Sequence, residues 1–194
     1  MGSAPRVRAR NPRWLSRVYF QNNTGDLLRS FLVITNPSLD TQLQPLNGDA
    51  RALEEWLTTF HLASIVLDPF TNESAWILPT AVRILRQFSD ASVRTNIVIT
   101  AAPDETRTFL GPYADEFLVF CDPLRTFVKQ LGLDEIPAFV YIQIDGSVPV
   151  SAQGWNAQAW RSVADYIATA VLWSKPLIPA PGDPDTFKGS PALV

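Results

Sequence analysis

Short apolar runs alternate with amphipathic segments along most of the chain. The run LASIVL at residues 62–67 is apolar at nearly every position, which is typical of a parallel strand buried on both faces. A turn at Asp145-Gly146 divides the last two strands into a hairpin. The predicted strands cover residues 30–35, 62–67, 93–100, 117–120, 138–144 and 147–150.

Helical spacing of apolar residues marks the segments between these runs. The predicted helices cover residues 49–60, 72–88, 103–113, 122–131 and 155–173. Residues 37–48 read as a loop, His61 is expected to end the first helix, and Pro79 falls inside the second. We find no internal repeat.

Strands that alternate with helices favour parallel pairing through crossover connections, and the final hairpin adds an antiparallel edge. The sequence therefore predicts an α/β fold with a central mixed sheet flanked by helices. We divide the chain into an N-terminal arm over residues 1–28, a domain over residues 29–173 and a proline-rich tail over residues 174–194, which we expect to be flexible.

Composition narrows the class of protein. Of the 194 residues 46% are hydrophobic, which is the composition of a globular domain. No apolar run is long enough to cross a bilayer or to form a secretory signal, so we expect a cytoplasmic protein. Because the chain has one Cys and one His, an intrachain disulfide and a Cys/His metal cluster are excluded, and we expect neither a metal nor a cofactor.

Five arginines and no acidic residue lie in the first 17 residues. They leave the rest of the chain with a net charge of about −8, since the whole has −3. The arm is either a solvated tail or a contact segment for an acidic protein, an anionic membrane surface or nucleic acid. These arginines are Arg6, Arg8, Arg10, Arg13 and Arg17.

Three motifs together resemble the thioredoxin superfamily. The segment VLDPFTNESAWILP at residues 66–79 is similar to its active-site turn, in which a strand leads into CxxC at the start of a helix and a proline follows. The segment LDEIPAFVYIQIDG at residues 133–146 is similar to its cis-proline strand and hairpin. The segment FCDP at residues 120–123 resembles the Asp-Pro segment that precedes the cis-proline.

The resemblance covers about residues 60–172 and implies a thioredoxin-like fold. A central insertion over about residues 95–120 makes the chain look more like TlpA-type thioredoxins and peroxiredoxins than like a minimal thioredoxin. It also implies that the peptide bond between Ile136 and Pro137 is cis.

The same resemblance places Thr71 and Ser74 where the redox cysteines should be. A hydroxyl is too weak an acid to replace the thiolate and cannot form a disulfide, so thiol chemistry is disabled at this turn. Peroxiredoxins have a TxxC arrangement, which Thr71-Asn-Glu-Ser74 matches with Ser in place of Cys. The structural alternative is helix capping, in which Thr71 accepts a hydrogen bond from the N–H of Glu73 or Ser74. A serine hydrolase would need a base, and His61 lies at the wrong end of the preceding helix.

Cys121 is the single remaining thiol. It follows an apolar run and precedes Asp122, whose charge would raise the thiol pKa if it lay close. A buried, inert cysteine is one interpretation. The other is an exposed Cys121 that supports a thiol-dependent oxidoreductase or peroxidase, the enzyme class that the sequence leaves open.

Loss of the redox residues with retention of the cis-proline strand favours a binding function. In thioredoxins the backbone next to the cis-proline pairs with an extended substrate segment. We therefore expect a redox-inactive accessory module that binds a protein through this groove, with a nucleic-acid-associated role of the arm as a further alternative. The expected groove residues, each of which core packing would also explain, are Phe70, Trp76, Ile136, Pro137 and Phe139.

Overall fold

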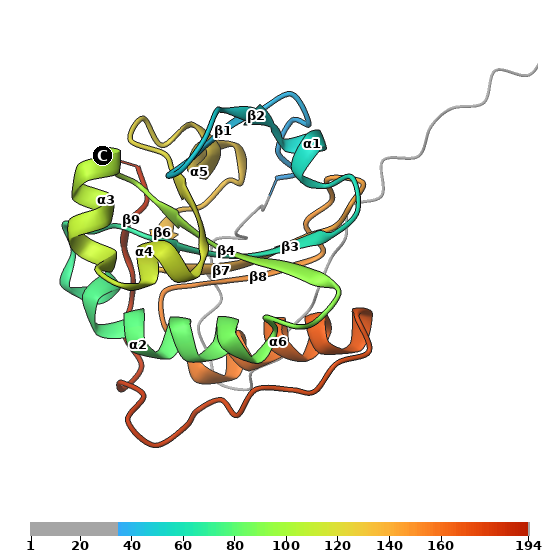
Figure 1. Ribbon diagram of the computed structural model, residues 1–194. Coiled ribbons are helices and arrows are strands. Elements are labelled where there is room, and N and C mark those ends of the chain that lie inside the picture. The colour runs from blue at the N-terminus through green and yellow to red at the C-terminus, as the bar shows by residue number, and fades with distance from the viewer. Residues whose placement is uncertain (1–34, 194) are drawn as a thin grey trace, which may run out of the picture. The chain divides into compact units, whose positions relative to one another are not determined.

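The computed structural model describes residues 35–193, and its centre is a seven-stranded mixed sheet (Figure 1). The strand order is β2-β1-β5-β4-β3-β7-β8. Strands β3, β4 and β5 pair in parallel, and the other pairs are antiparallel. The strands are β1 (Gln42–Pro45), β2 (Arg51–Ala52), β3 (His61–Leu67), β4 (Val93–Ile99), β5 (Leu118–Cys121), β7 (Ala138–Ile142) and β8 (Val150–Gln153).

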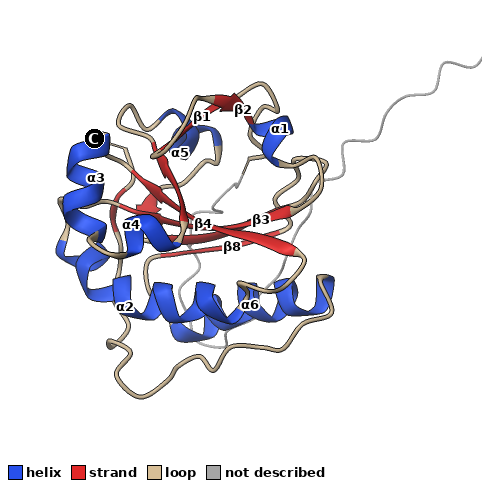
Figure 2. Cartoon of the chain, in the orientation of Figure 1, coloured by secondary structure: helices blue, strands red, loops and turns tan. Residues whose placement is uncertain are grey.

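Helices cover both faces of this sheet (Figure 2). One face packs against α2 (Asn72–Gln87), α3 (Pro103–Leu110), α4 (Tyr113–Glu116) and α6 (Ala157–Ala170). The other packs against α1 (Leu53–Trp56) and α5 (Thr126–Gln130). Strand β3 is buried along almost its whole length, because its two neighbours and both helical layers cover it. The predicted α/β architecture with a flanked mixed sheet is confirmed.

The second predicted helix and the predicted parallel strands also match, whereas the helix expected over residues 103–113 ends at Leu110 and the one expected over residues 122–131 begins only at Thr126. Residues 72–88 form α2 with Pro79 inside it, and the parallel pairing of β3, β4 and β5 follows the predicted crossovers. The region of residues 95–120 forms most of β4, the helices α3 and α4, and the start of β5. The returning strand of the hairpin begins later than predicted, at Val150.

The N-terminal part of the domain differs from its prediction. The helix expected over residues 49–60 is reduced to α1, because residues 51–52 pair with β1 and the N–H groups of Leu53 and Glu54 bond to loop carbonyls instead of a preceding turn. The loop expected over residues 37–48 contains β1, and His61 begins β3 rather than ending a helix. The strand expected over residues 30–35 lies outside the described residues except for Thr35, and the arm lies entirely outside them.

The tail was expected to be flexible, and the structure contradicts this. The side chain of Arg83 on α2 pairs with both carboxylate oxygens of Asp183 at 2.8 Å. Ile178 is buried in the core between the sheet and helices α2 and α6. Farther along, β9 (Ser190–Pro191) pairs antiparallel with β6 (Glu135–Ile136). The proline and glycine content of the tail did not indicate that Asp183 and Ile178 would hold this segment against the domain.

Candidate functional site

The candidate site lies where β3 leads into α2. Asp68 and Thr71 form a turn in which the backbone N–H of Thr71 donates to the carbonyl of Asp68 at 3.2 Å. The Oγ of Ser74 accepts the backbone N–H of Asp68 at 2.9 Å, and Ser74 is completely buried. Thr71 Oγ1 lies 3.0 Å from Ser74 Oγ and donates to the carbonyl of Asp68 at 3.0 Å. The two hydroxyls therefore close the turn.

This network corrects the expectation that Thr71 caps α2 through its side chain. Thr71 occupies the N-cap position, but its side chain accepts no hydrogen bond from a backbone N–H of the helix. Its hydroxyl is instead engaged with Asp68 and Ser74. Thr71 and Ser74, the positions that resemble CxxC, thus lie side by side as two alcohols joined by a hydrogen bond.

A buried ion pair between Asp68 and Arg125 also supports this turn. Asp68 Oδ2 lies 2.7 Å from Arg125 Nη2, and Asp68 Oδ1 accepts the backbone N–H of Phe70 at 3.0 Å. Arg125 has a left-handed backbone (φ 54°) just before α5, a conformation that costs a non-glycine residue energy. Its other amino group, Nη1, donates to the carbonyl of Ala192 at 2.8 Å. Sequence patterns gave no signal for this residue, because a single arginine between Pro123 and a short helix has no distinctive spacing.

Strand β7, which begins directly after Pro137, pairs with β3 at the end that leads into this turn. Val66 pairs with Ala138 in the antiparallel register of β3 and β7, which places Pro137 level with Leu67. The Ile136–Pro137 peptide bond is cis, and Ile136 is completely buried. The sequence-predicted residues Thr71, Ser74, Ile136 and Pro137 are therefore brought together at one end of the sheet.

The backbone of Glu135–Ile136, which we call the β6 edge, is occupied by the C-terminal part of the chain. Glu135 pairs with Pro191 and Ile136 with Ser190, and the N–H of Ala192 donates to the carbonyl of Asp134 at 2.8 Å. In Figure 1, this red segment runs upward past α2 to the label β9. Sequence analysis missed this contact, because a two-residue strand within a proline-rich segment carries no period.

The three aromatic residues expected in the groove differ in how far their side chains are exposed to solvent. Phe70 is 70% exposed and Trp76 is 56% exposed, so both present aromatic surface next to the turn. The ring of Trp76 makes an edge-on contact with Phe187, with centroids 5.7 Å apart. Phe139 is completely buried and packs on Trp160, so its assignment to the groove is wrong: its side chain points into the core below the sheet.

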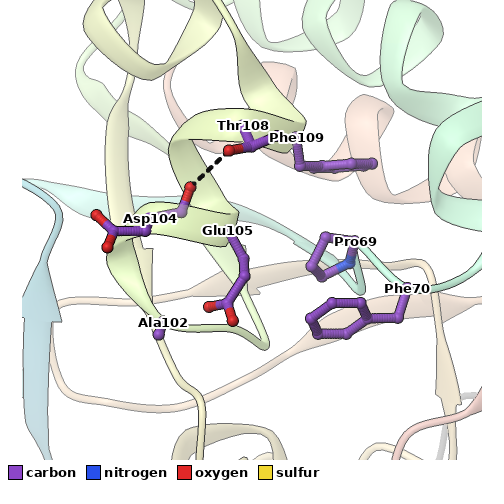
Figure 3. Close-up of a pocket in the computed structure, with 7 residues that line it drawn as sticks. All are labelled: Pro69, Phe70, Ala102, Asp104, Glu105, Thr108 and Phe109. Carbon is purple, nitrogen blue, oxygen red and sulfur yellow. Dashed lines mark hydrogen bonds between the residues drawn. The ribbon is translucent and has the colours of Figure 1, made fainter.

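A hollow of about 530 Å³ opens between Phe70 and helix α3. Figure 3 shows Pro69 and Phe70 on one side of it and the side chains of Glu105 and Phe109 on the other. Its lining combines aromatic rings with the carboxylate of Glu105, whereas the carboxylate of Asp104 points away from the hollow (Figure 3).

Cys121 ends β5 at the same end of the sheet, but it is buried. Burial raises the pKa of its thiol, while a hydrogen bond with Thr106 and the charge of Arg107 oppose this rise. The Sγ atom lies 3.6 Å from Thr106 Oγ1. Burial, rather than the neighbouring Asp122, is the main reason that this thiol resists ionisation. The carboxylate of Asp122 is turned toward α5, where it accepts the N–H groups of Thr126 and Val128.

Two further properties concern only the described part of the chain. Among residues 35–193, no group of three or more His, Cys, Asp or Glu side chains is arranged to hold a metal ion. None of the helices in that range combines the length and apolar composition needed to span a bilayer.

Comparison with solved structures identifies the fold. The chain is similar to a putative thiol:disulfide interchange protein DsbE from Chlorobium tepidum, with a TM-score of 0.60 and 16% identity over 72% of this chain and 99% of that chain. It is also similar to a mutant of PrxQ from Xylella fastidiosa, with a TM-score of 0.58 and 14% identity over 73% and 99% of the two chains. The fold is thioredoxin-like.

A third similar structure is that of a putative thioredoxin from Neisseria meningitidis, with a TM-score of 0.58 and 15% identity over 71% of this chain and 91% of that chain. No family model and no curated sequence matches the chain. The similarity spans 91–99% of these three solved chains. Beyond α6, the present chain returns to the β6 edge.

Proposed function

We propose that this thioredoxin-like protein is a binding module without thiol redox chemistry, which accepts an extended segment of a partner protein at the β6 edge. The observation that carries the proposal is the pairing of β9 with β6 beside Pro137. An extended segment already pairs with β6 there, in a separate two-stranded sheet, so the backbone groups of Glu135–Ile136 are suited to strand addition.

The chemistry of the turn supports the absence of redox activity. Thr71 and Ser74 lie at the start of α2, where the helix dipole would stabilise a thiolate. Alcohols at these positions gain nothing comparable, because their pKa values lie far above that of a thiol. Cys121 is buried with a raised pKa, which opposes its use as a nucleophile.

The surface around the β6 edge supports binding. Phe70 and Trp76 expose large rings on either side of the turn, and aromatic anchors of this kind carry much of the energy of many interfaces. The hollow beside Phe70 offers space for a side chain of the bound segment, and the carboxylate of Glu105 favours a basic one.

The redox part of the proposal is tested with native protein. We expect Cys121 to react with a disulfide reagent and with hydrogen peroxide only after unfolding, and we expect no reduction of insulin in the presence of dithiothreitol. Fast reaction of the folded protein, together with turnover that is lost on alkylation of Cys121, would instead establish a thiol enzyme.

The binding part is tested on an array of extended ten-residue peptides with a full-length variant whose β6 edge is open. Gly189→Ala serves this purpose, because a Cβ atom there would lie 2.8 Å from the carbonyl oxygen of Ile136. We expect a subset of peptides to bind, and Trp76→Ala in the same background to weaken them about tenfold, the loss of one interface anchor. Thr186→Ala, a change at an exposed residue, is the matched control. If hydrogen exchange shows the edge to be open and no peptide binds, the proposed function is wrong.

A further inference from the structure

The segment that fills the β6 edge contacts it through a distinct pattern of residues. Gly189 lies so close to β6 that an added Cβ would stand 2.8 Å from the carbonyl oxygen of Ile136 and 2.9 Å from the Cβ of Glu135. Because the first of these neighbours is backbone, β6 cannot easily move away. The position just before Ser190, the residue that pairs with Ile136, therefore requires glycine.

Three residues later the segment meets a second restriction. Ala192 is completely buried and belongs to the core cluster that contains Ile136. Its N–H bonds to Asp134 and its carbonyl accepts from Arg125, so its backbone is held at both ends. A side chain larger than a methyl group has no space there. Between the two small residues, Pro191 is exposed.

An aromatic residue precedes the glycine by two positions. The backbone of Phe187 exchanges two hydrogen bonds with Trp155, both at 3.0 Å, and its ring contacts Trp76. Lys188, which lies between Phe187 and Gly189, is exposed and pairs with Glu135 at 3.3 Å. The bound segment thus reads aromatic-x-Gly-x-x-Ala.

The chain is fixed separately just before this segment. Asp183 is held by Arg83 and by its hydrogen bond with Thr80, and the carbonyl of Pro184 accepts from the indole of Trp155 at 2.8 Å. Residues after Pro184 can therefore leave the β6 edge while the anchor at Asp183 remains. A segment tethered in this way stays at an effective concentration of about 1 mM.

Resting on the proposed function, we propose that residues 187–192 are a tethered internal ligand of the β6 edge, and that the partner is an extended segment of the same pattern, aromatic-x-Gly-x-x-Ala, which displaces it. A segment that would bind untethered with a dissociation constant of about 100 µM, present at an effective concentration of about 1 mM, weakens a competing peptide roughly tenfold. The module is therefore closed to weak ligands and opens to segments that match this pattern.

The test uses full-length protein and a fluorescent peptide of residues 186–193, followed by fluorescence anisotropy. We expect the peptide to bind Gly189→Ala at least about tenfold more tightly than the wild type or the control Thr186→Ala. A peptide with Gly189→Val, and another with Ala192→Leu, should each lose binding to the open variant. Hydrogen exchange of residues 187–192 verifies that the variant has released its segment, and Ala192→Trp provides a second way to open the edge.

The outcomes separate this inference from the proposed function. Equal binding of the peptide to wild type and to both open variants would overturn the tethered competitor while leaving the binding function intact. Undiminished binding of the valine and leucine peptides would overturn the pattern. A wild-type dimer in sedimentation that exchanges its segments between copies would overturn the intramolecular placement. Open variants that bind neither this peptide nor any peptide of the array would overturn the proposed function itself.

Discussion

The guanidinium of Arg125 lies 2.7 Å from the carboxylate of Asp68, and their side chains are only 13% and 6% exposed. This pair joins the turn that carries Thr71 to the segment before α5. Through the bond from Arg125 to the carbonyl of Ala192 it also reaches the internal ligand at the β6 edge. A single side chain thus contacts both the turn and the segment at the β6 edge.

Replacement of Arg125 by Met should be strongly destabilising. It leaves the carboxylate of Asp68 buried without its cation, a change that costs about 3–5 kcal/mol. We expect this decrease in the free energy of unfolding by urea denaturation, together with faster hydrogen exchange at residues 189–192.

The matched control is Arg86→Met, which breaks an exposed pair with Glu116 whose side chains are 53% and 37% exposed. Solvent screens this pair, so its loss should lower stability far less than the loss of the buried pair. The double variant Asp68→Asn/Arg125→Met should be more stable than Arg125→Met alone, because it removes the unpaired charge. Similar losses in Arg125→Met and Arg86→Met would contradict this account of the buried pair.

Introducing cysteines at the turn should introduce thiol chemistry. Thr71 Oγ1 and Ser74 Oγ already lie 3.0 Å apart at the start of α2, so Thr71→Cys/Ser74→Cys is expected to form a disulfide between positions 71 and 74. The helix N-terminus should lower the pKa of the thiol at position 71. We expect insulin reduction at least about tenfold above that of the wild type.

Thr71→Cys alone is the control, since one thiol at the turn cannot form this disulfide. Mass spectrometry after alkylation distinguishes the bridged form from one in which Cys121 has reacted. If the double variant keeps two free thiols under oxidising conditions, the two positions do not have the geometry of a redox pair.

How far the sequence could predict this site depends on the range of the contacts. The strands and helices around Thr71 and Pro137 follow from local periods and turn residues, and these were predicted. Arg125 and Ala192 were not, because their roles rest on contacts 57 and 67 residues apart, which no local pattern records. The role of the arm stays a prediction, because the arm lies outside the described residues. The cytoplasmic location also stays a prediction.

Exposure was the other property that the pattern could not assign. Phe139 and Trp76 are both aromatic residues near the motifs, yet Phe139 is completely buried and Trp76 is mostly exposed. The alternation of β7 would expose every second side chain on a sheet open to solvent, but this strand is covered on both faces, so all five of its residues are buried.

This difference leads to opposite effects of substitution. Phe139→Ala should lower the free energy of unfolding by about 3–5 kcal/mol, because it leaves a cavity against Trp160. Trp76→Ala should change stability by less than about 1 kcal/mol and act mainly on binding. Chemical denaturation of both variants tests this, and a stable Phe139→Ala protein with impaired peptide binding would return Phe139 to the binding surface.

Tyr141 on β7 provides a test of the core through pH. Its side chain is buried, its hydroxyl finds no hydrogen-bond partner among residues 35–193, and burial, together with the charge of Tyr166, raises its pKa from 10.0 to about 12. Below about pH 10 the hydroxyl is neutral in both the folded and the unfolded chain. Above about pH 10 the tyrosine hydroxyl of the unfolded chain ionises before that of the folded chain. The contribution of Tyr141 to the free energy of unfolding is therefore lost as the pH rises toward 12.

Tyr141→Phe should therefore remove part of the alkaline destabilisation, up to about 2–3 kcal/mol at pH 12. Near neutral pH it should leave stability unchanged or raise it by up to about 1 kcal/mol, because no buried hydrogen bond is lost. Urea denaturation at pH 7 and pH 11 measures both effects, with Tyr113→Phe at a half-buried position as the control. A loss of more than about 1 kcal/mol at pH 7 would mean that the hydroxyl of Tyr141 has a partner that stabilises the fold.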